Sequence, residues 1–252
     1  MKALVTGASS GIGKEFSIIL SNMGYDLVLV SRNETDLKKV SKLCKGNVEI
    51  YKVDLTKKEE CVKLFNKYKD IDLLINNAGF GLFGSFDNTS LNKELDMIDL
   101  NIKAVHILTK LYLKEMISKD SGRILNVASS AAFLPGPLMS TYYSTKSYVY
   151  RLTTAIYEEL RRIKSNVKVS VLCPGPVKTN FNKVADVEFS VKGLTSNYVA
   201  DYALKKMFKN KLVIIPGFIP KLGMVASKFF PLKLVARVDY NIQKKKEVQD
   251  EK

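Results

Sequence analysis

A tyrosine and a lysine four residues apart, Tyr142 and Lys146, are the side chains best suited to move a proton. Residues 141–164 have helical spacing, which would place both side chains on one face. A free tyrosine has a pKa of about 10, and a lysine cation beside it favours the phenolate. Such a pair could exchange a proton with a hydroxyl or carbonyl oxygen near neutral pH. Ser129, which ends an apolar run, could donate a hydrogen bond to the same oxygen.

Neighbouring residues leave the assignment within this group open. Tyr143 lies three residues before Lys146, so a helix would also bring it within reach of the lysine. Ser130 directly follows Ser129 and could offer the same hydroxyl group. The alternative to a catalytic role is that the tyrosines of this helix only pack or cap at the surface.

A glycine-rich turn follows the first apolar run, Ala3–Val5, and leads into a helical pattern. Residues 6–13 read Thr-Gly-Ala-Ser-Ser-Gly-Ile-Gly, a G-x-x-x-G-x-G spacing. In a strand–turn–helix unit, Gly7 would allow the tight turn, Gly11 would let the backbone approach a diphosphate, and Gly13 would let helix and strand pack closely. Free N–H groups at the helix start attract phosphates. A glycine-rich loop without a ligand is the alternative, but the position favours a dinucleotide site.

The end of the second apolar run bears on which dinucleotide is preferred. An NAD site usually has Asp or Glu there to bind the ribose 2′-hydroxyl, whereas Arg accommodates a 2′-phosphate. This chain has Ser31 followed by Arg32. The residues therefore favour NADP(H) over NAD(H). The alternative is that Arg32 is only a surface cation without a ligand.

Short apolar runs alternate with helical patterns along the first 172 residues. Runs of this kind are typical of strands buried on both faces of a parallel sheet, and the alternation predicts βαβ units. The expected strands are Ala3–Val5, Leu27–Val30, a run through Val48, Ile50 and Val53, Leu73–Ile75, Ile124–Val127 and Val167–Leu172. The expected helices are Ile12–Met23, Thr35–Cys44, Lys57–Tyr68, Leu91–Lys119 and Thr141–Lys164. We expect an α/β fold: a single Rossmann-type, doubly wound parallel sheet with helices on both faces.

Composition excludes several classes of protein. The 252 residues carry a net charge of +15, but the lysines are dispersed, which favours a solvated surface over nucleic-acid binding. One histidine, His106, cannot build a multi-histidine metal site, so no metal is expected. We expect it to serve in packing or at a subunit interface and not as a base. Three separated cysteines indicate reduced thiols and a cytoplasmic protein, and Cys173 reads as a small buried thiol. No secretory signal or membrane-spanning run is apparent.

The motifs together resemble the short-chain dehydrogenase/reductase family over about residues 1–182. They occur in the family's order: the turn at 6–13, Asp54-Leu55, Asn76-Asn77-Ala78-Gly79, Asn101, Ser129, Tyr142, Lys146, Pro174-Gly175 and Thr179. The sequence around Ser129, followed by Pro135-Gly136-Pro137, is similar to one branch of this family, which contains bacterial general oxidoreductases and hydroxysteroid and ketoacyl reductases. Both the Tyr-x-x-x-Lys spacing and the step of 13 residues from Ser129 match the family at Tyr142 and not at Tyr143.

The resemblance implies a role for each matched residue. Ser129 would orient the substrate, Tyr142 would be the acid/base, Lys146 would also hold the nicotinamide ribose, and Asn101 would position a water linking Lys146 to solvent. Hydride would pass between nicotinamide and the substrate carbon. The residues implied in cofactor binding are Gly7, Ser9, Ser10, Gly11, Ile12, Gly13, Ser31, Arg32, Asp54, Leu55, Asn77, Ala78, Gly79, Tyr142, Lys146, Pro174, Gly175, Val177 and Thr179.

The last quarter of the chain is where substrate choice is expected to lie. We expect one catalytic domain over residues 1–240, with a substrate-facing elaboration at about 176–238, and a polar, charged tail over 241–252. Within it we expect a loop at 175–195, a helix at 196–209 and a strand at Leu212–Ile215. The apolar, lysine-studded segment up to about Val238 could wall an apolar pocket, form a subunit contact or rest on an anionic membrane.

The sequence thus points to an NADP(H)-dependent carbonyl reductase or alcohol dehydrogenase acting on a bulky apolar substrate. A 3-oxoacyl-type reductase for carrier- or CoA-linked substrates is the alternative enzyme, since a positive surface would suit an acidic carrier. A non-catalytic NADP(H)-binding regulator is the alternative of another class, although the complete Ser129, Tyr142 and Lys146 set argues against it. The resemblance further implies a homodimer or homotetramer, formed through the helices at about 91–119 and 141–164.

Overall fold

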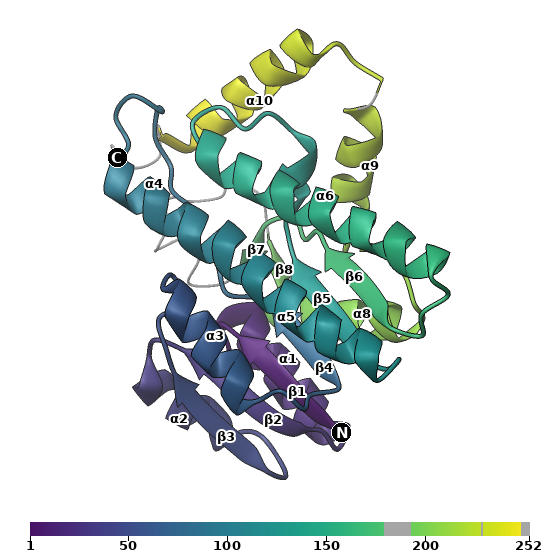
Figure 1. Ribbon diagram of the computed structural model, residues 1–252. Coiled ribbons are helices and arrows are strands. Elements are labelled where there is room, and N and C mark those ends of the chain that lie inside the picture. The colour runs from purple at the N-terminus through teal and green to yellow at the C-terminus, as the bar shows by residue number, and fades with distance from the viewer. Residues whose placement is uncertain (179–192, 228, 248–252) are drawn as a thin grey trace.

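The computed structural model describes residues 1–178, 193–227 and 229–247, and its centre is a parallel sheet (Figure 1). Seven strands lie in the order β3-β2-β1-β4-β5-β6-β9, and each neighbouring pair is parallel. Their bounds are β1 Lys2–Thr6, β2 Asp26–Ser31, β3 Val48–Lys52, β4 Leu73–Asn76, β5 Arg123–Val127, β6 Lys168–Leu172 and β9 Val213–Ile214. The chain reverses its direction of travel across the sheet between β1 and β4. Ligands bind at such a switch point in open α/β sheets, and the expected fold class is confirmed.

Helices cover both faces of the sheet. One apolar core joins it to α1 (Gly11–Asn22), α2 (Glu34–Ser41) and α8 (Ser196–Phe208). A second core joins the other face to α3 (Lys58–Lys67), α5 (Val105–Ser118) and α6 (Ser140–Arg162). The strands are buried on both sides, which is why their sequences are nearly continuous apolar runs.

The long helix expected over 91–119 is interrupted. It consists of α4 (Leu91–Ile98), a π-helical stretch η1 (Asp99–Ala104) and then α5. A π-helical turn accommodates an extra residue and is frequent at functional sites. Here it contains Asn101, whose fully buried amide bonds the backbone of Phe80. Apolar spacing alone gave no sign of this interruption, because the helix axis continues through it.

The carboxyl-terminal part of the chain completes the sheet and one of its faces and then continues at the carboxyl ends of the strands. A short parallel pair, β7 (Val177–Lys178) and β8 (Leu194–Thr195), precedes α8. After β9 come α9 (Phe218–Ala226) and α10 (Leu232–Glu247), which lie together at the top of the molecule in Figure 1. The expected boundary between domain and polar tail at 240/241 falls inside α10, so residues 241–247 are helical. The loop between β5 and α6 contains a 3₁₀ turn, η2 (Ser130–Phe133).

None of the helices that the structure describes is long and apolar enough to cross a bilayer.

Candidate active site

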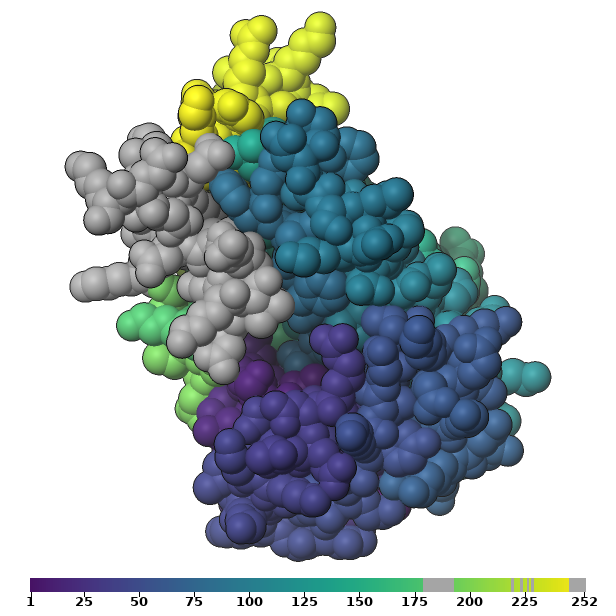
Figure 2. Space-filling model, turned by 90° about the vertical axis from the view of Figure 1, so that its left-hand side faces the viewer, coloured from purple at the N-terminus to yellow at the C-terminus, as the bar shows by residue number. Residues whose placement is uncertain are grey.

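A cavity of about 700 Å³ lies along the carboxyl ends of β1, β4, β5 and β6 and is bordered by α9 and α10. Figure 2 shows a hollow on the corresponding face, with purple atoms of the N-terminal part of the chain along its border. The sequence-predicted residues that line the cavity are Gly7, Ser9, Ser10, Gly11, Ile12, Ser31, Arg32, Leu55, Asn77, Ala78, Gly79, Ser129, Tyr142, Lys146, Pro174, Gly175 and Val177. Residues from 7 to 177 therefore meet at one place.

A few predicted site residues do not line the cavity. Gly13 lies behind the turn and Asn101 lies behind Gly79, and both are buried. Asp54 sits just outside, where its Oδ1 accepts hydrogen bonds from the backbone and side chain of Thr56. Thr179 lies outside the residues that the structure describes. Gly13 and Asn101 can act only through the residues that they support.

The glycine turn between β1 and α1 leaves room for a diphosphate beside its backbone. Gly7 and Gly11 have φ angles of +65° and +54°, a left-handed conformation that suits glycine. A Cβ on Gly13 would stand 2.2 Å from the Gly7 carbonyl oxygen, so only glycine allows helix and turn to approach this closely. Because the turn leads into the amino terminus of α1, N–H groups of the first helical turn face the cavity. The residues present fit a dinucleotide phosphate group.

Asn77 fixes this turn to the next strand of the sheet. Its Nδ2 donates to the backbone oxygens of Thr6 at 3.0 Å and Gly7 at 3.3 Å. In return, the Thr6 hydroxyl accepts from the backbone N–H groups of Asn77 and Ala78 at 2.9 and 3.0 Å. The Thr-Gly and Asn-Asn-Ala-Gly motifs are thus two halves of one hydrogen-bonded joint.

The adenosine end of the expected cofactor site is polar and cationic. The Ser31 hydroxyl at the end of β2 donates to the Ser9 hydroxyl at 2.9 Å, which joins β2 to the glycine turn. A second, shallow cavity beside Arg32 is bordered by Lys38 and Lys52. Lys38 is paired with Glu34 at 2.7 Å, so Arg32 and Lys52 supply the unbalanced positive charge there.

Tyr142 reaches the cavity from the first turn of α6. Burial raises its pKa to about 12, and a hydrogen bond with the Ser129 side chain opposes that rise. The Lys146 ammonium lies 5.8 Å from the centre of the Tyr142 ring. Burial is thus the larger of these two influences on the Tyr142 pKa within the protein chain. Tyr142 remains a protonated phenol at neutral pH, which is the form of an acid.

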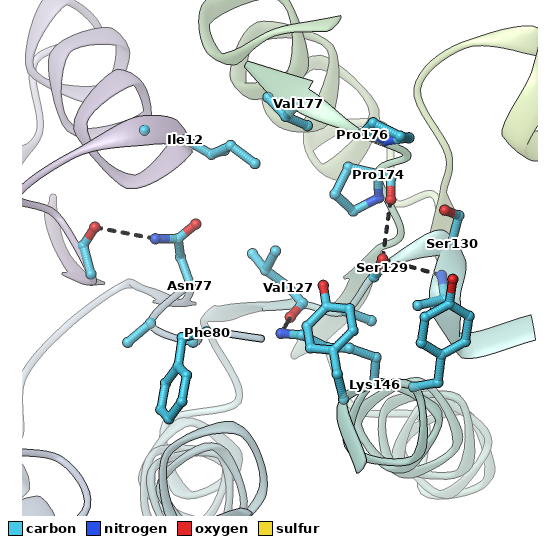
Figure 3. Close-up of a pocket in the computed structure, with 18 of the residues that line it drawn as sticks. Ile12, Asn77, Phe80, Val127, Ser129, Ser130, Lys146, Pro174, Pro176 and Val177 are labelled. Carbon is cyan, nitrogen blue, oxygen red and sulfur yellow. Dashed lines mark hydrogen bonds between the residues drawn. The ribbon is translucent and has the colours of Figure 1, made fainter. Parts of the chain in front are cut away.

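Lys146 lies one helical turn after Tyr142 and is only 6% exposed. Its Nζ donates to the backbone oxygen of Val127, at the end of β5, at 3.1 Å. Burial lowers the pKa of Lys146 to about 8. Figure 3 shows this bond, with Ile12 and Asn77 on one side of the cavity and Ser129 and Pro174 on the other.

Ser129 is held at the end of β5 in extended backbone, just before η2. Its hydroxyl accepts from the backbone N–H of Ala131 at 3.1 Å and lies 3.5 Å from the Pro174 oxygen. Ser130 also lines the cavity, and the hydrogen bond that lowers the Tyr142 pKa comes from the Ser129 side chain. This contact distinguishes the two adjacent serines, which the residue types alone could not do.

Asn101 supports the site from behind. Its Nδ2 donates to the oxygen of Phe80 at 2.9 Å and to the Thr145 hydroxyl at 3.1 Å, and its Oδ1 accepts from the Phe80 N–H at 3.1 Å. A Cβ on Gly79 would stand 2.8 Å from Asn101 Oδ1 and 3.2 Å from Lys146 Nζ. Asn101 therefore positions the backbone at 79–80 and the helix that carries Tyr142.

The sequence missed the polar residues that α10 contributes. Asp239 and Gln243 are buried and line the cavity. Gln243 Nε2 donates to the Tyr143 hydroxyl, and Asp239 Oδ2 accepts from the Gly136 N–H at 3.0 Å. Two polar residues four apart inside an expected tail and elaboration carry no recognisable motif. Their burial depends on where α10 packs, which spacing cannot reveal.

Of the other residues singled out in the sequence, Cys173 lies near enough to Lys146 to interact with its charge, whereas His106 does not line the cavity. His106 is exposed and its Nδ1 lies 2.7 Å from the Tyr148 hydroxyl. Cys173 is buried, as expected, and burial raises the pKa of its thiol. Within the described ranges, no group of three His, Cys, Asp or Glu side chains could hold a metal ion.

Comparisons with known proteins agree with this geometry. The family model described as short chain dehydrogenase matches residues 1–188. An uncharacterized oxidoreductase of Staphylococcus saprophyticus is 36% identical over 185 residues, which are 70% of this chain and 78% of that one. A short-chain dehydrogenase from Sphingobium yanoikuyae, solved in complex with NADPH, has a TM-score of 0.82 at 27% identity, covering 90% of this chain and 92% of its own. The bulky-bulky ketone specific alcohol dehydrogenase from Comamonas testosteroni has a TM-score of 0.77 at 25% identity, covering 91% and 94%. The chain belongs to the short-chain dehydrogenase/reductase family of oxidoreductases.

Proposed function

We propose that this protein interconverts a carbonyl and a secondary alcohol with NADP(H), on a bulky apolar substrate. The observation that carries the proposal is the meeting of Tyr142, Ser129 and Lys146 at one cavity with a glycine turn that fits a diphosphate. The bound nicotinamide would supply or accept the hydride. We further propose that residues 1–240, with the whole of α10, form one catalytic domain.

Residues of the protein would transfer the proton and position the substrate oxygen. Ser129 would donate a hydrogen bond to that oxygen and hold it beside the Tyr142 hydroxyl. In the reductive direction Tyr142 would donate its proton to the oxygen as the carbonyl becomes an alcohol, and in the oxidative direction it would take that proton back. The Lys146 cation would stabilise the phenolate left after each donation, and its hydrogen bond to Val127 fixes where that charge stands. Asn101 would act through the Phe80 backbone and the helix carrying Tyr142.

The preference for NADP(H) over NAD(H) rests on charge at the end of β2. Ser31 occupies the position where a carboxylate would select the 2′-hydroxyl, and Arg32 with Lys52 borders the adjoining shallow cavity. A 2′-phosphate would find two cations there and no unpaired carboxylate on that cavity's border. The NADPH complex of the Sphingobium relative supports this preference.

The proposal of an apolar substrate rests on the side chains that line the other end of the cavity. Its border there is formed by side chains from η2, the loop between η2 and α6, α9 and α10, namely Phe133, Leu134, Met139, Met224 and Ile242. Such a wall favours a ligand that buries apolar area around its one reacting oxygen. The likeness to a bulky-ketone alcohol dehydrogenase supports the same substrate class.

A panel of ketones and alcohols, followed by the absorbance of reduced nicotinamide with NADPH/NADP⁺ and with NADH/NAD⁺, tests the proposal. We expect turnover of lipophilic ketones with NADPH to exceed turnover of small polar carbonyls. Activity confined to carrier- or CoA-linked 3-oxoacyl compounds would replace the proposal with the ketoacyl alternative. NADPH binding without turnover of any substrate would indicate a regulator.

Assembly and location remain proposals of the same kind. We propose a homodimer or homotetramer through α4, α5 and α6, whose outer surfaces expose Leu95, Ile117 and Tyr157. Light scattering after gel filtration tests this, and a monomer would contradict it. The three unpaired cysteines support a cytoplasmic location.

A further inference from the structure

The outer surfaces of α9, α10 and the loop between them are unusually apolar. In the part of the chain that the structure describes, 21 large apolar side chains are strongly exposed, and ten of them fall within residues 218–242. The two most exposed of these ten are Phe229, at 80%, and Phe218, at 77%. Scattered exposed apolar residues are ordinary, but a dense group marks an interaction surface. We call these ten residues the hairpin surface: Phe218, Leu222, Val225, Phe229, Phe230, Leu232, Leu234, Val238, Tyr240 and Ile242.

The exposed residues of α9 form one stripe. Phe218, Leu222 and Val225 stand at positions i, i+4 and i+7, so they share a face of the helix. Pro220 and Met224 project from a different side of the same helix and line the cavity. The helix is therefore apolar both toward the cavity and toward solvent, which a helix that only walls a pocket does not require.

The outside of α10 carries an apolar stripe and a cationic stripe. Leu234, Val238 and Ile242 follow one another at intervals of four residues and are about half exposed, and Ile242 also lines the cavity. The exposed cations Lys233, Arg237 and Lys244 follow a parallel line at intervals of four and seven. The buried Asp239 and Gln243 point inward between the two lines. This is the pattern of a helix that lies in a membrane interface with its basic residues directed at the headgroups.

The charged side chains of residues 218–244 that reach the surface have a single sign. Residues 218–244 contain one acidic residue, Asp239, and it is buried. Exposed Lys221 on α9 adds to the cations of α10, and the whole chain carries +15. Two copies meeting through this surface would bring the same cations together, which disfavours self-association. An anionic surface with an apolar interior matches both properties at once.

We propose that the hairpin surface docks this protein on a bilayer containing anionic lipid. Phe229 and Phe230, in the loop between α9 and α10, would enter the apolar region, while Lys221, Lys233, Arg237 and Lys244 would contact the headgroups. Since α9 and α10 also border the cavity, the docked protein would hold its substrate cavity close to the bilayer. Figure 2 shows α10, in yellow, as a projecting end of the molecule, which leaves it accessible to a flat partner.

Co-sedimentation of the full-length protein with vesicles tests this proposal. The probes are vesicles of phosphatidylcholine alone and vesicles of equal parts phosphatidylcholine and phosphatidylglycerol. We expect strong binding only to the second kind, weakening as salt is raised. Phe229→Ser/Phe230→Ser should lower the partition coefficient at least about 100-fold. Lys233→Glu/Arg237→Glu should lower it by at least about 25-fold, since each basic residue near an anionic surface adds about fivefold.

Matched control variants lie at the opposite edge of the sheet. Met23→Ser/Leu43→Ser removes two exposed apolar side chains there, and Lys42→Glu/Lys45→Glu reverses two exposed charges. Both should bind the anionic vesicles as the unchanged protein does. Absence of binding to anionic vesicles would overturn the proposal, as would equal losses in control and hairpin variants. Self-association that is lost in Phe229→Ser/Phe230→Ser, without vesicle binding, would assign the surface to a second copy instead. Each of these results is independent of turnover.

Discussion

The Nζ atom of Lys146 is hydrogen-bonded to the backbone oxygen of Val127 at 3.1 Å, inside the protein. This bond joins the face of α6 that carries Tyr142 to the end of β5, the strand that precedes Ser129. It holds an ammonium group where water cannot fully solvate it, and burial lowers the pKa of Lys146 to about 8. The site therefore keeps a charge at a cost in stability, as functional sites often do.

Lys146→Met should stabilise the fold while abolishing turnover. The lowering of the Lys146 pKa from 10.5 to about 8 means that burying the ammonium destabilises the folded protein by about 3 kcal/mol, which the variant regains. Losing the hydrogen bond to Val127 takes away about 1 kcal/mol of that gain. We expect the free energy of unfolding to rise by about 2 kcal/mol at pH 7, measured by urea denaturation. The penalty is complete below about pH 8 and absent above pH 10.5, because the folded protein binds fewer protons than the unfolded chain between those values. The gain should shrink as pH rises through that window, and a gain independent of pH would contradict this account.

Gly7→Ala should impair cofactor binding more than its backbone conformation alone explains. Gly7 and Gly46 both have positive φ, +65° and +75°. A Cβ on Gly7 would stand 2.8 Å from Asn77 Nδ2, whereas a Cβ on Gly46 meets nothing within 4 Å. Gly46→Ala should thus lose about 1–2 kcal/mol of stability with an unchanged KM for NADPH. Gly7→Ala should raise that KM at least about tenfold, and equal KM values for the two variants would count against a dinucleotide at this turn.

Arg32→Asp should invert the preference between the two dinucleotides. The change removes a cation from the shallow cavity and places a carboxylate next to Ser31, the position from which a carboxylate would bind the ribose 2′-hydroxyl. We expect kcat/KM with NADPH to fall roughly 10- to 100-fold, the usual range for a charged hydrogen bond, and kcat/KM with NADH to rise. Lys42→Asp, outside the cavity, is the control and should change neither. An unaltered ratio would mean that the adenosine 2′ position lies elsewhere.

Gln243→Leu should alter substrate binding and leave the cofactor untouched. The substitution keeps a side chain of similar size but removes the hydrogen bond to the Tyr143 hydroxyl, which lies beside Tyr142. Leaving that buried hydroxyl without its donor costs about 1–3 kcal/mol of folding stability. Because the Tyr143 ring is then no longer held beside Tyr142, the substrate KM should rise with little change in the KM for NADPH. Asn241→Leu, exposed on the same helix, should match the unchanged protein. A change confined to the KM for NADPH would show that Gln243 does not border the substrate.

Much of the fold and most of the site follow from the sequence because their signals are local. Buried parallel strands leave continuous apolar runs, and the turn at 6–13 can be recognised without knowing anything distant. The interruption of the long helix at Asn101 left no trace in apolar spacing, since its cause is a contact with Phe80, 21 residues away. Asp239 and Gln243 were missed for the same reason: their contacts with Gly136 and Tyr143 span about 100 residues.

The electrostatics of the site could be anticipated only in part. The proximity of Tyr142 and Lys146 follows from helical spacing, but the degree of burial does not. Burial raises the pKa of Tyr142 to about 12 and lowers the pKa of Lys146 to about 8. Spacing suggested instead that the lysine would make the tyrosine more acidic. The balance between a nearby charge and lost solvation is a property of the packed structure.

The central claim is that Tyr142, and not its neighbour Tyr143, exchanges the proton with the substrate. The most direct measurement is kcat for ketone reduction by Tyr142→Phe and Tyr143→Phe, with NADPH affinity of each variant followed by nicotinamide fluorescence. The account predicts that kcat falls at least about 100-fold in Tyr142→Phe, with NADPH affinity retained, and stays within about tenfold in Tyr143→Phe. Unchanged kcat in Tyr142→Phe, or a collapse of kcat in Tyr143→Phe alone, would contradict it.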